Sequence, residues 1–331
     1  NTTGANNVAI GYQSLTSNTT ASHNNALGYG SLNSNTTGEQ NAAFGHNALG
    51  TSTTAAAASA FGFQALMSNT TGSYNSAFGS LTLDANTTGA NNTGLGYGVL
   101  TVCATASNNT GVGYKALHMN ESGGTNNTAV GSSALLANTT GTDNTALGKS
   151  SMLNNQTHHR NTSVGYQSMA SGVQGDNNVA IGYNSLYTNT ADNNTALGYN
   201  SLFANTSGTL NTAVGQGALD ANTTADNNTA VGHASLTTNT TGSSNSALGL
   251  NSLQANTTGA SNTAVGQDAL YANTTASNNT AIGKGAMVAA TTGDRNVAVG
   301  ALALDATDDG IGNVAVGYSA LSANCGDTNT A

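Results

Sequence analysis

The sequence predicts an all-β protein, a parallel β-solenoid (a β-roll or β-helix) of about 19 coils built on a 17-residue repeat. One glycine recurs from Gly11 and Gly28 to Gly317, and this 17-residue period is interrupted by a single 18-residue step and a single 16-residue step. The period is too short for repeats built from pairs of helices, which need more than about 30 residues. Glycine, β-branched residues and Asn-Thr turns suit short strands with tight bends.

Each copy of the repeat predicts the same elements in the same order. In the first copy a strand over Asn7–Gly11 is followed by a bend, a second strand near Gln13–Ser17 and a turn over Asn18–Ser22. Parallel pairing of successive coils about 4.8 Å apart would give a structure roughly 90 Å long. The 18-residue copy carries its irregularity at Met119–Thr125, so we expect the turns to absorb changes of length. The repeat covers residues 1–331, which predicts one continuous domain and a segment of a longer fibre.

Three columns of the repeat predict the core. Leu or Met stands four residues after each glycine, and Ile, Leu, Val or Phe stands directly before it. Asn stands four residues before the glycine in 18 of 19 copies. Stacked amides of this column can bond from coil to coil as they do in cross-β assemblies. We therefore predict a structural asparagine ladder that includes Asn7, Asn24, Asn41, Asn75, Asn92 and Asn109.

The composition excludes several classes of function. Charged residues make up 6% of the chain and the net charge is −9, which argues against nucleic acid because that partner needs a clustered basic surface. The longest apolar runs fall far short of the roughly 20 residues that span a bilayer, so no membrane insertion is expected. No catalytic triad or phosphate loop can be recognised, and we expect neither an enzyme nor a cofactor. A weak calcium site near Asp305, Asp308 and Asp309 is the one metal alternative.

The repeat also resembles known surface proteins. The segments Asn7–Ser14 (NVAIGYQS) and Asn178–Ser185 (NVAIGYNS) resemble the head repeats of YadA-like trimeric autotransporter adhesins. Those heads use an S-V-A-I-G-x-x-S motif to build a left-handed parallel β-roll. The longer unit N-T-A-V-G-Y-x-A-L-x-x-N-T-T-G is similar to β-solenoid repeats of phage-like tail-fibre proteins. This chain departs from the adhesin head by its longer repeat, and trimerisation and host attachment are what the resemblance implies.

The N-T-T turn supplies candidate glycosylation sites. An N-x-S/T sequon on an exposed turn of a secreted protein can accept a glycan. Asn and Thr also favour turns through local hydrogen bonds, so this alternative stays open. A second set of sequons, Asn91, Asn108, Asn126, Asn193, Asn227 and Asn278, lies beside the inner column and is expected to be less accessible. The candidate acceptors on the N-T-T turns are Asn18, Asn35, Asn69, Asn86, Asn138, Asn205, Asn222, Asn239, Asn256 and Asn273.

The same turns align threonines in two columns, one from Thr19 and Thr36 and the other from Thr20 and Thr37. Regular hydroxyl arrays at the strand spacing are what β-solenoid antifreeze proteins present to ice. Adjacent residues in a turn should diverge, however, and ice-binding threonines usually lie on strands. Ice binding is therefore an alternative hypothesis.

Tyrosines that follow the glycine form another row. Exposed aromatic rings can stack on sugars or form a seam between chains, and the third alternative is a stack between coils that stabilises a turn. The residues of this row are Tyr12, Tyr29, Tyr97, Tyr114, Tyr166, Tyr183 and Tyr199.

The two cysteines, Cys103 and Cys325, lie 13 coils apart in the predicted solenoid, too far for a disulfide within the chain. They are either free thiols or the partners of disulfides between subunits.

Together these features predict a self-assembling structural protein, an extracellular fibre, filament or adhesin shaft on a cell or virion surface. Its partners would be copies of itself and, on its turns, glycans. Ice binding and a tail-fibre module that binds cell-surface sugars are the alternatives.

Overall fold

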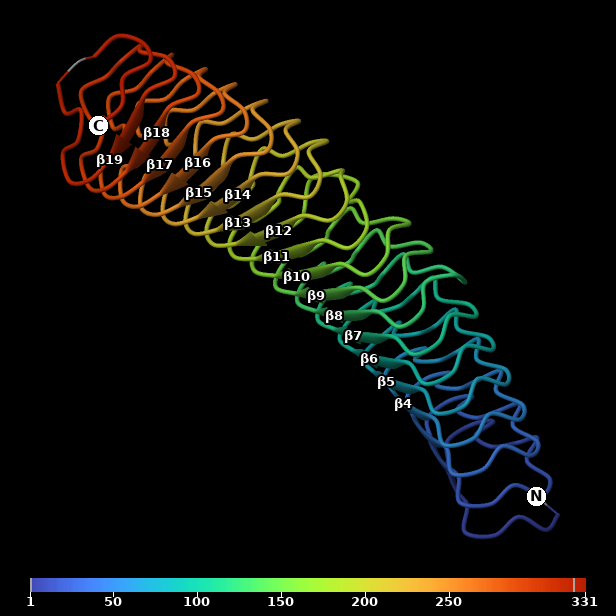
Figure 1. Ribbon diagram of the computed structural model, residues 1–331. Helices are drawn as coiled ribbons and strands as arrows, with labels where there is room; N and C mark the ends of the chain where they lie inside the picture. Colours follow the sequence, from blue (N-terminus) through green and yellow to red (C-terminus); the bar gives the residue numbers. More distant parts are fainter. Residues whose placement is uncertain (1, 324) are drawn as a thin grey trace. The chain divides into compact units, whose positions relative to one another are not determined.

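The computed structural model describes residues 2–323 and 325–331 and confirms the parallel β-solenoid (Figure 1). Within these residues there is one three-residue strand per coil, and successive strands keep the period of the repeated glycine. The strands are β1 Val8–Ile10, β2 Asn25–Leu27, β3 Ala42–Phe44, β4 Ser59–Phe61, β5 Ser76–Phe78, β6 Thr93–Leu95, β7 Thr110–Val112, β8 Thr128–Val130, β9 Thr145–Leu147, β10 Thr162–Val164, β11 Val179–Ile181, β12 Thr195–Leu197, β13 Thr212–Val214, β14 Thr229–Val231, β15 Ser246–Leu248, β16 Thr263–Val265, β17 Thr280–Ile282, β18 Val297–Val299 and β19 Val314–Val316.

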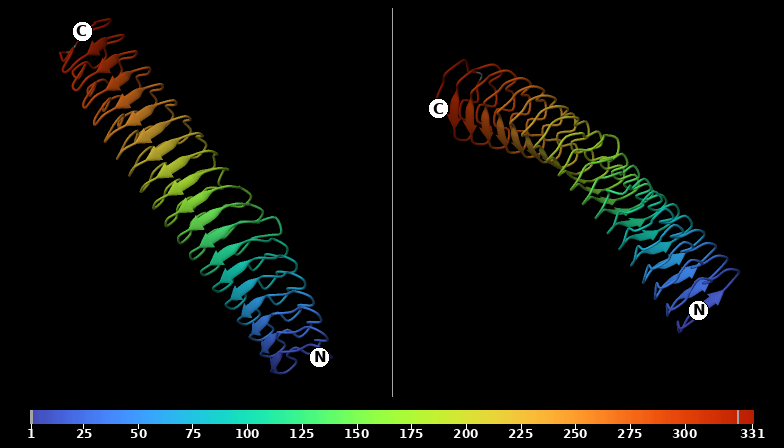
Figure 2. Two further views of the ribbon diagram at one scale, coloured as in Figure 1. Left: turned by 60° about the horizontal axis from the view of Figure 1, so that its bottom comes forward. Right: turned by 90° about the vertical axis from the view of Figure 1, so that its right-hand side faces the viewer.

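The chain divides into two compact units that meet in sequence between Val164 and Gly165. In the first unit β1 to β10 pair in parallel, each with the next, and in the second β11 to β19 do the same (Figure 2). Equivalent residues of neighbouring coils are direct partners, as Thr212 and Thr229 are between β13 and β14. Both units are built from the same coil, and one continuous domain over 1–331 stays a prediction.

The second strand predicted near Gln13–Ser17 is wrong. Gln13 and Leu15 have φ angles of 56° and 51°, and the equivalent positions of later coils are also left-handed. Alternating left-handed residues wind this segment into a tight curve that no extended strand can follow. The curve still bonds to the next coil, because the amide of Leu15 donates to Ser31 O at 3.0 Å. Each coil therefore has one extended side and one tightly curved side.

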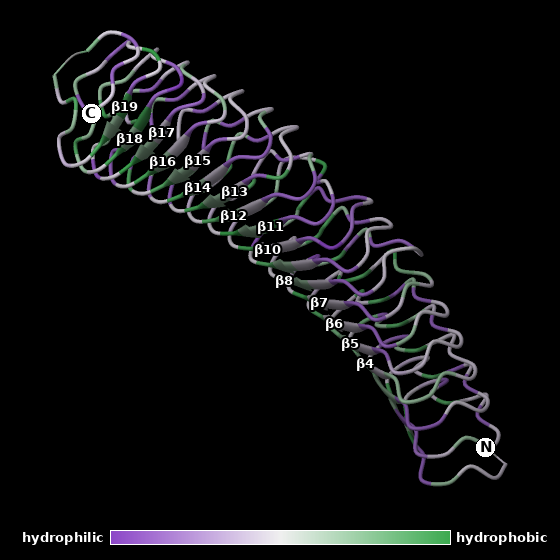
Figure 3. Cartoon of the chain, in the orientation of Figure 1, coloured by the Kyte–Doolittle hydropathy of each residue, from purple (hydrophilic) through white to green (hydrophobic). Residues whose placement is uncertain are grey.

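The core of each coil is thin and includes many polar side chains. The predicted Leu/Met column is confirmed, since its members from Leu32 to Leu304 are fully buried. The small central residue of each strand from β2 to β19, usually alanine, is buried beside it. The hydrophobic residue that ends each strand was expected inside as well, and this expectation is wrong: Leu27 is 42% exposed and Ile10 57%. Residues at the two ends of a three-residue strand point to the face opposite its centre. Hydrophilic segments recur at the same place in successive coils (Figure 3), and these include the asparagine columns described below.

The turns absorb irregular coil lengths, as expected. In the 18-residue copy the side-chain Nδ2 of Asn120 donates to Gly124 O, four positions later in the chain. In regular copies the same hydrogen bond spans three positions, as from Asn138 to Gly141. In the 16-residue copy Asn189 reaches Ala191 O, two positions on. The hydrogen bond that closes the turn is kept in both cases while the loop between its ends changes.

The repeated glycine carries the sharpest backbone constraint. Gly232 has a φ of 141°, and a Cβ there would lie 2.3 Å from Gly249 O in the next coil. We expect Gly232→Ala to lower the free energy of unfolding by at least about 1–3 kcal/mol, because it combines a forbidden φ with a clash against backbone. Chemical denaturation of the intact chain measures this loss.

The matched control is Gly217→Asn in the preceding coil. Gly217 has a φ of 65°, and asparagine adopts a similar conformation at the equivalent Asn200 and Asn251. This variant should be close to the parent in stability. Equal stability of Gly232→Ala and Gly217→Asn would contradict the steric argument.

Candidate functional site

The asparagines of the N-T-T turns face inward, not outward. Asn222 and its equivalents are 0–1% exposed. The Nδ2 of Asn222 donates to Asn205 Oδ1 in the preceding coil at 2.9 Å and to Ala225 O in the same turn at 3.1 Å. Asn239 Nδ2 in turn donates to Asn222 Oδ1 at 3.0 Å. These residues, which we call the turn ladder, form chains of amide–amide hydrogen bonds from coil to coil.

The column that contains Asn7 and Asn24 is also a ladder, but of a different kind. Asn24 Oδ1 accepts the backbone N–H of Asn41 in the next coil at 3.0 Å, and Asn24 Nδ2 donates to Gly38 O at 2.9 Å. Its bonds therefore run mainly from amide to backbone. Asn41, Asn75, Asn92 and Asn109 repeat this arrangement and are buried, and Asn7, half-buried in the first coil, makes the same bonds. We call this column the strand ladder.

The two ladders meet at one carbonyl in most regular coils. Gly38 O accepts Asn24 Nδ2 and Asn35 Nδ2, both at 2.9 Å. Gly208 O likewise accepts from Asn194 and Asn205 at 2.9 Å. A carbonyl oxygen has two lone pairs, so this group satisfies both amides at once. The paired donors connect the coils across their interior.

Breaks in the turn ladder leave unsatisfied oxygens. Among the described residues the Oδ1 atoms of Asn35, Asn86 and Asn273 are buried without a hydrogen-bond partner. In each case the next coil has another residue in the ladder position, namely Ser52, Cys103 and Ala290. The continuity of asparagine therefore matters to the energy of the interior.

Buried sequons conflict with the expected row of surface glycans. Both hydrogens of Asn222 Nδ2 are already in hydrogen bonds inside the coil. A glycan on that nitrogen would replace one of these donors and would have to occupy the core. The expectation that Asn18, Asn35, Asn69, Asn86, Asn138, Asn205, Asn222, Asn239, Asn256 and Asn273 point outward is therefore wrong. The second set of sequons, which was expected to be less accessible, is the exposed one, and its members are Asn91, Asn108, Asn126, Asn193, Asn227 and Asn278.

The tyrosine row lies on the surface, and its rings stack between coils. The side chains of Tyr12, Tyr29, Tyr97, Tyr114, Tyr166, Tyr183 and Tyr199 are 40–68% exposed. Tyr183 stacks on Tyr199 with centroids 5.3 Å apart, and Tyr97 stacks on Tyr114 at 5.8 Å. His46 continues the row against Tyr29 at 4.9 Å. Because neighbouring rings cover one another's faces, mainly ring edges and hydroxyls are presented outward, which favours the stack between coils over sugar stacking.

The two threonine columns of the turn diverge. Hydroxyls of the first column donate to the backbone of the next coil, as Thr36 does to Thr53 O at 3.0 Å and Thr240 does to Thr257 O at 3.0 Å. In the second column Thr37 and Thr241 are exposed. The first column is therefore part of the coil-to-coil bonding, and these two columns together do not form the paired hydroxyl array expected for ice.

No cluster of candidate metal ligands is found in the described part of the chain. No three His, Cys, Asp or Glu side chains in it lie close enough to hold a metal ion. The carboxylate of Asp308 accepts a hydrogen bond from the hydroxyl of Thr291. It does not form a group of metal ligands with Asp305 and Asp309. Cys103 and Cys325 form no disulfide within the described chain. Burial raises the pKa of Cys103 to about 11, which keeps its thiol protonated near neutral pH.

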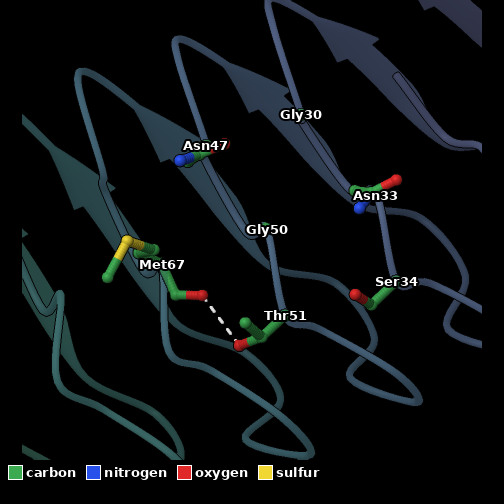
Figure 4. A pocket seen from close by; sticks show the side chains of 7 residues that line it. All are labelled: Gly30, Asn33, Ser34, Asn47, Gly50, Thr51 and Met67. Atoms are coloured by element: carbon green, nitrogen blue, oxygen red, sulfur yellow. Dashed lines mark hydrogen bonds between the residues drawn. The ribbon is translucent and has the colours of Figure 1, made fainter. Parts of the chain in front are cut away.

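An open depression of about 250 Å³ lies where Gly50 lacks a side chain between the equivalent residues Asn33 and Met67 of the adjacent coils (Figure 4). Thr51 Oγ1 lies at its edge and donates to Met67 O at 2.8 Å. The other lining residues are Gly30, Ser34 and Asn47, so its walls are neutral. The depression marks a local variation of the repeat.

Neither a scan against protein-family models nor a search of curated proteins found a match to the chain. The described residues contain no helix with the length and apolarity needed to cross a membrane.

The Cys103 position gives a test of the turn ladder. In Cys103→Asn the new Nδ2 can donate to Asn86 Oδ1, and the new Oδ1 can accept from Asn120 Nδ2, which now lies 4.0 Å from the sulfur. We expect this variant to raise the free energy of unfolding by about 0.5–1.5 kcal/mol, the net value of a typical hydrogen bond. Denaturant unfolding measures the gain. Cys103→Ala removes the thiol without extending the ladder and should give no gain, so an Asn variant no more stable than the Ala variant would contradict the role of the ladder.

Asp220 gives a test by pH. Burial raises the pKa of this half-buried carboxyl above its usual value, so the fold disfavours the ionised form. Its contribution to stability is full below the unfolded pKa and is lost as the pH rises through the folded pKa. We expect Asp220→Asn to raise the melting temperature at pH 7, with the advantage shrinking as the pH falls below about 4.

Asp143 provides the opposite case. Hydrogen bonds from Thr142 and Asn126 lower the pKa of this exposed carboxyl, so its ionised form supports the fold. Asp143→Asn should therefore slightly lower the melting temperature at pH 7 and have no effect in acid. Thermal unfolding across this pH range measures both variants, and the same sign for both at pH 7 would refute the electrostatic argument.

Proposed function

We propose that the chain is a non-catalytic structural protein, a β-solenoid segment of an extracellular fibre or filament that assembles with copies of itself. The observation that carries the proposal is that hydrogen bonds of the same kinds recur from coil to coil in both units. Besides the strand pairing, successive coils are joined by the strand ladder, the turn ladder and the first threonine column, as between Thr223 and Thr240 at 3.2 Å. Because the same hydrogen bonds recur between neighbouring coils, they can hold the coils together along the solenoid axis without a large hydrophobic core.

The distribution of polar groups supports this proposal. The amides that a binding or catalytic protein would direct at a ligand are here directed at the next coil, as Asn256 Nδ2 is at Asn239 Oδ1 at 2.8 Å. The surface includes rows with one residue type repeated, such as the stacked tyrosines. Rows of this kind suit lateral contact between identical subunits, since each coil offers the same group at the same spacing.

Electron cryomicroscopy of native material from cells that make the chain tests the proposal. We expect filaments outside the cell envelope, with a repeat of about 4.8 Å along the axis from the parallel coils. The filaments should be lost or shortened in an Asn222→Ala/Asn239→Ala variant, which interrupts the turn ladder, and kept in Thr241→Ala, which changes an exposed turn residue. Separate single chains confined to the cell interior would overturn the proposal.

A further inference from the structure

The outward face of the strands is an ordered surface that none of the features above uses. In the second unit its first row includes Thr195, Thr212, Thr229, Ser246, Thr263 and Thr280, and its second row includes Leu197, Val214, Val231, Leu248, Val265 and Ile282. The central residue of each of these strands is a buried alanine, so the two outer residues share the opposite face. The first unit has the same pattern from Thr93 to Thr162. We call this surface the strand face.

The hydroxyls of the strand face are available to solvent. Thr229 lies in an exposed position, and in the described part of the chain its Oγ1 forms no hydrogen bond, in contrast to Thr223 of the turn before it. Thr195 is also exposed and Thr212 is half-buried. The neighbouring aliphatic side chains are partly exposed, Leu197 at 44% and Leu248 at 49%. The face therefore has a row of hydroxyls without a partner in the described chain beside a row of partly exposed aliphatic side chains.

The strand face carries no charge, and its side chains recur at regular spacings. Among the described residues no strand in either unit contains Asp, Glu, Lys, Arg or His. Where the face carries rings, they stack from coil to coil, with planes 6° apart between Phe44 and Phe61 and 7° apart between Phe61 and Phe78. Neighbouring side chains of one row lie about 4.8 Å apart between coils, and the two rows lie about 6.6 Å apart along a strand.

From this geometry we infer that the strand face binds ice. Hexagonal ice presents oxygen atoms at a repeat close to the spacing between coils. Hydroxyls of the first row recur at that spacing and can exchange hydrogen bonds with lattice water, while the aliphatic side chains of the second row hold water in an ordered layer beside them. The described strands carry none of the charged groups that would order water in a pattern unlike ice.

The alternative occupant is the same face of a second copy. Closing the face against another protein surface would bury hydroxyls that have no partner within the described chain, and an unsatisfied buried hydroxyl costs about 1–3 kcal/mol. Against ice each hydroxyl keeps a water partner. The mixed composition of the face therefore favours a water lattice over an apolar contact.

The test is partition of the intact chain into slowly growing ice, together with inhibition of ice recrystallisation. We expect the parent chain to be enriched in the ice and to keep crystals small. Thr229→Lys and Thr263→Lys, each placing a charge on the strand face, should abolish both effects. Thr241→Lys and Thr258→Lys place the same charge on exposed turn positions of the same unit and should behave as the parent does.

Circular dichroism selects the folded variants, and the two strand-face substitutions are independent, so one that fails to fold leaves the other as the test. A parent chain that stays in the liquid overturns the inference. So does loss of activity in the turn variants with retention in the strand-face variants. A parent without ice activity whose multimers dissociate in Thr229→Lys but persist in Thr241→Lys would instead assign the face to contact between copies. None of these outcomes depends on whether the chain forms fibres in cells.

Discussion

The rest of the coil depends on one carbonyl that accepts two asparagine amides. In most regular coils the carbonyl three positions after the turn asparagine accepts two hydrogen bonds, as Ala225 O does from Asn211 Nδ2 at 2.8 Å and from Asn222 Nδ2 at 3.1 Å. These donors come from the strand side and the turn side of the coil, so the shared acceptor joins the two sides. Each asparagine then has its Oδ1 left for the neighbouring coil, where Asn222 Oδ1 accepts from Asn239. Closure of the coil and attachment between coils are therefore properties of the same side chains.

This arrangement explains how so narrow a core can be stable. Each coil buries one Leu or Met and a few alanines, and the large side chain supplies only about 1.5–3 kcal/mol. The Leu/Met residue lies in a left-handed conformation, as Leu236 does with a φ of 49°, a backbone region that costs roughly 1–2 kcal/mol for a non-glycine residue. Hydrogen bonds must then carry much of the stability, and buried amides satisfied on both sides supply them. A break such as Cys103, which leaves Asn86 Oδ1 unsatisfied, interrupts the ladder for one coil, because Asn86 donates to Asn69 before it and Asn138 donates to Asn120 after it.

The architecture could be predicted from the sequence because the architecture is periodic. The spacing of glycine indicated the coil, and the position of Ala26 between Asn25 and Leu27 is consistent with a short strand with one buried residue. Whether an asparagine side chain points into the coil or out to solvent was harder to predict. Asn7 and Asn18 are both asparagines at fixed phases, and nothing in their residue type distinguishes an inner amide from a turn amide on the surface. The signal that could have separated them is replacement: Ser52, Cys103, Ala290 and Thr307 are small residues, which suit a confined interior position.

The failure at Gln13–Ser17 has a related cause. The second strand was expected because glycine, β-branched residues and Asn-Thr turns suit short strands with tight bends. The same composition also allows a segment in which every second residue is left-handed and the chain curls around one buried leucine. Only the dimensions of the closed coil distinguish these cases, because two extended sides would enclose more space than one leucine and the alanines can fill. The small volume of the repeated residues therefore selects the curled side.

Burial of the turn ladder also constrains how such a fibre could reach the cell exterior. Transfer of oligosaccharide to an unfolded chain would modify Asn205, Asn222 and Asn239 before the coil closes, since each lies in an N-x-S/T sequon. The modified nitrogens could not make the two hydrogen bonds that close the coil and extend the ladder. An extracellular fibre with this interior therefore requires a route to the surface in which folding precedes any glycosylation, or in which these sequons are never modified. The exposed Asn193, Asn227 and Asn278 are the positions where a glycan added after folding would leave both ladders intact.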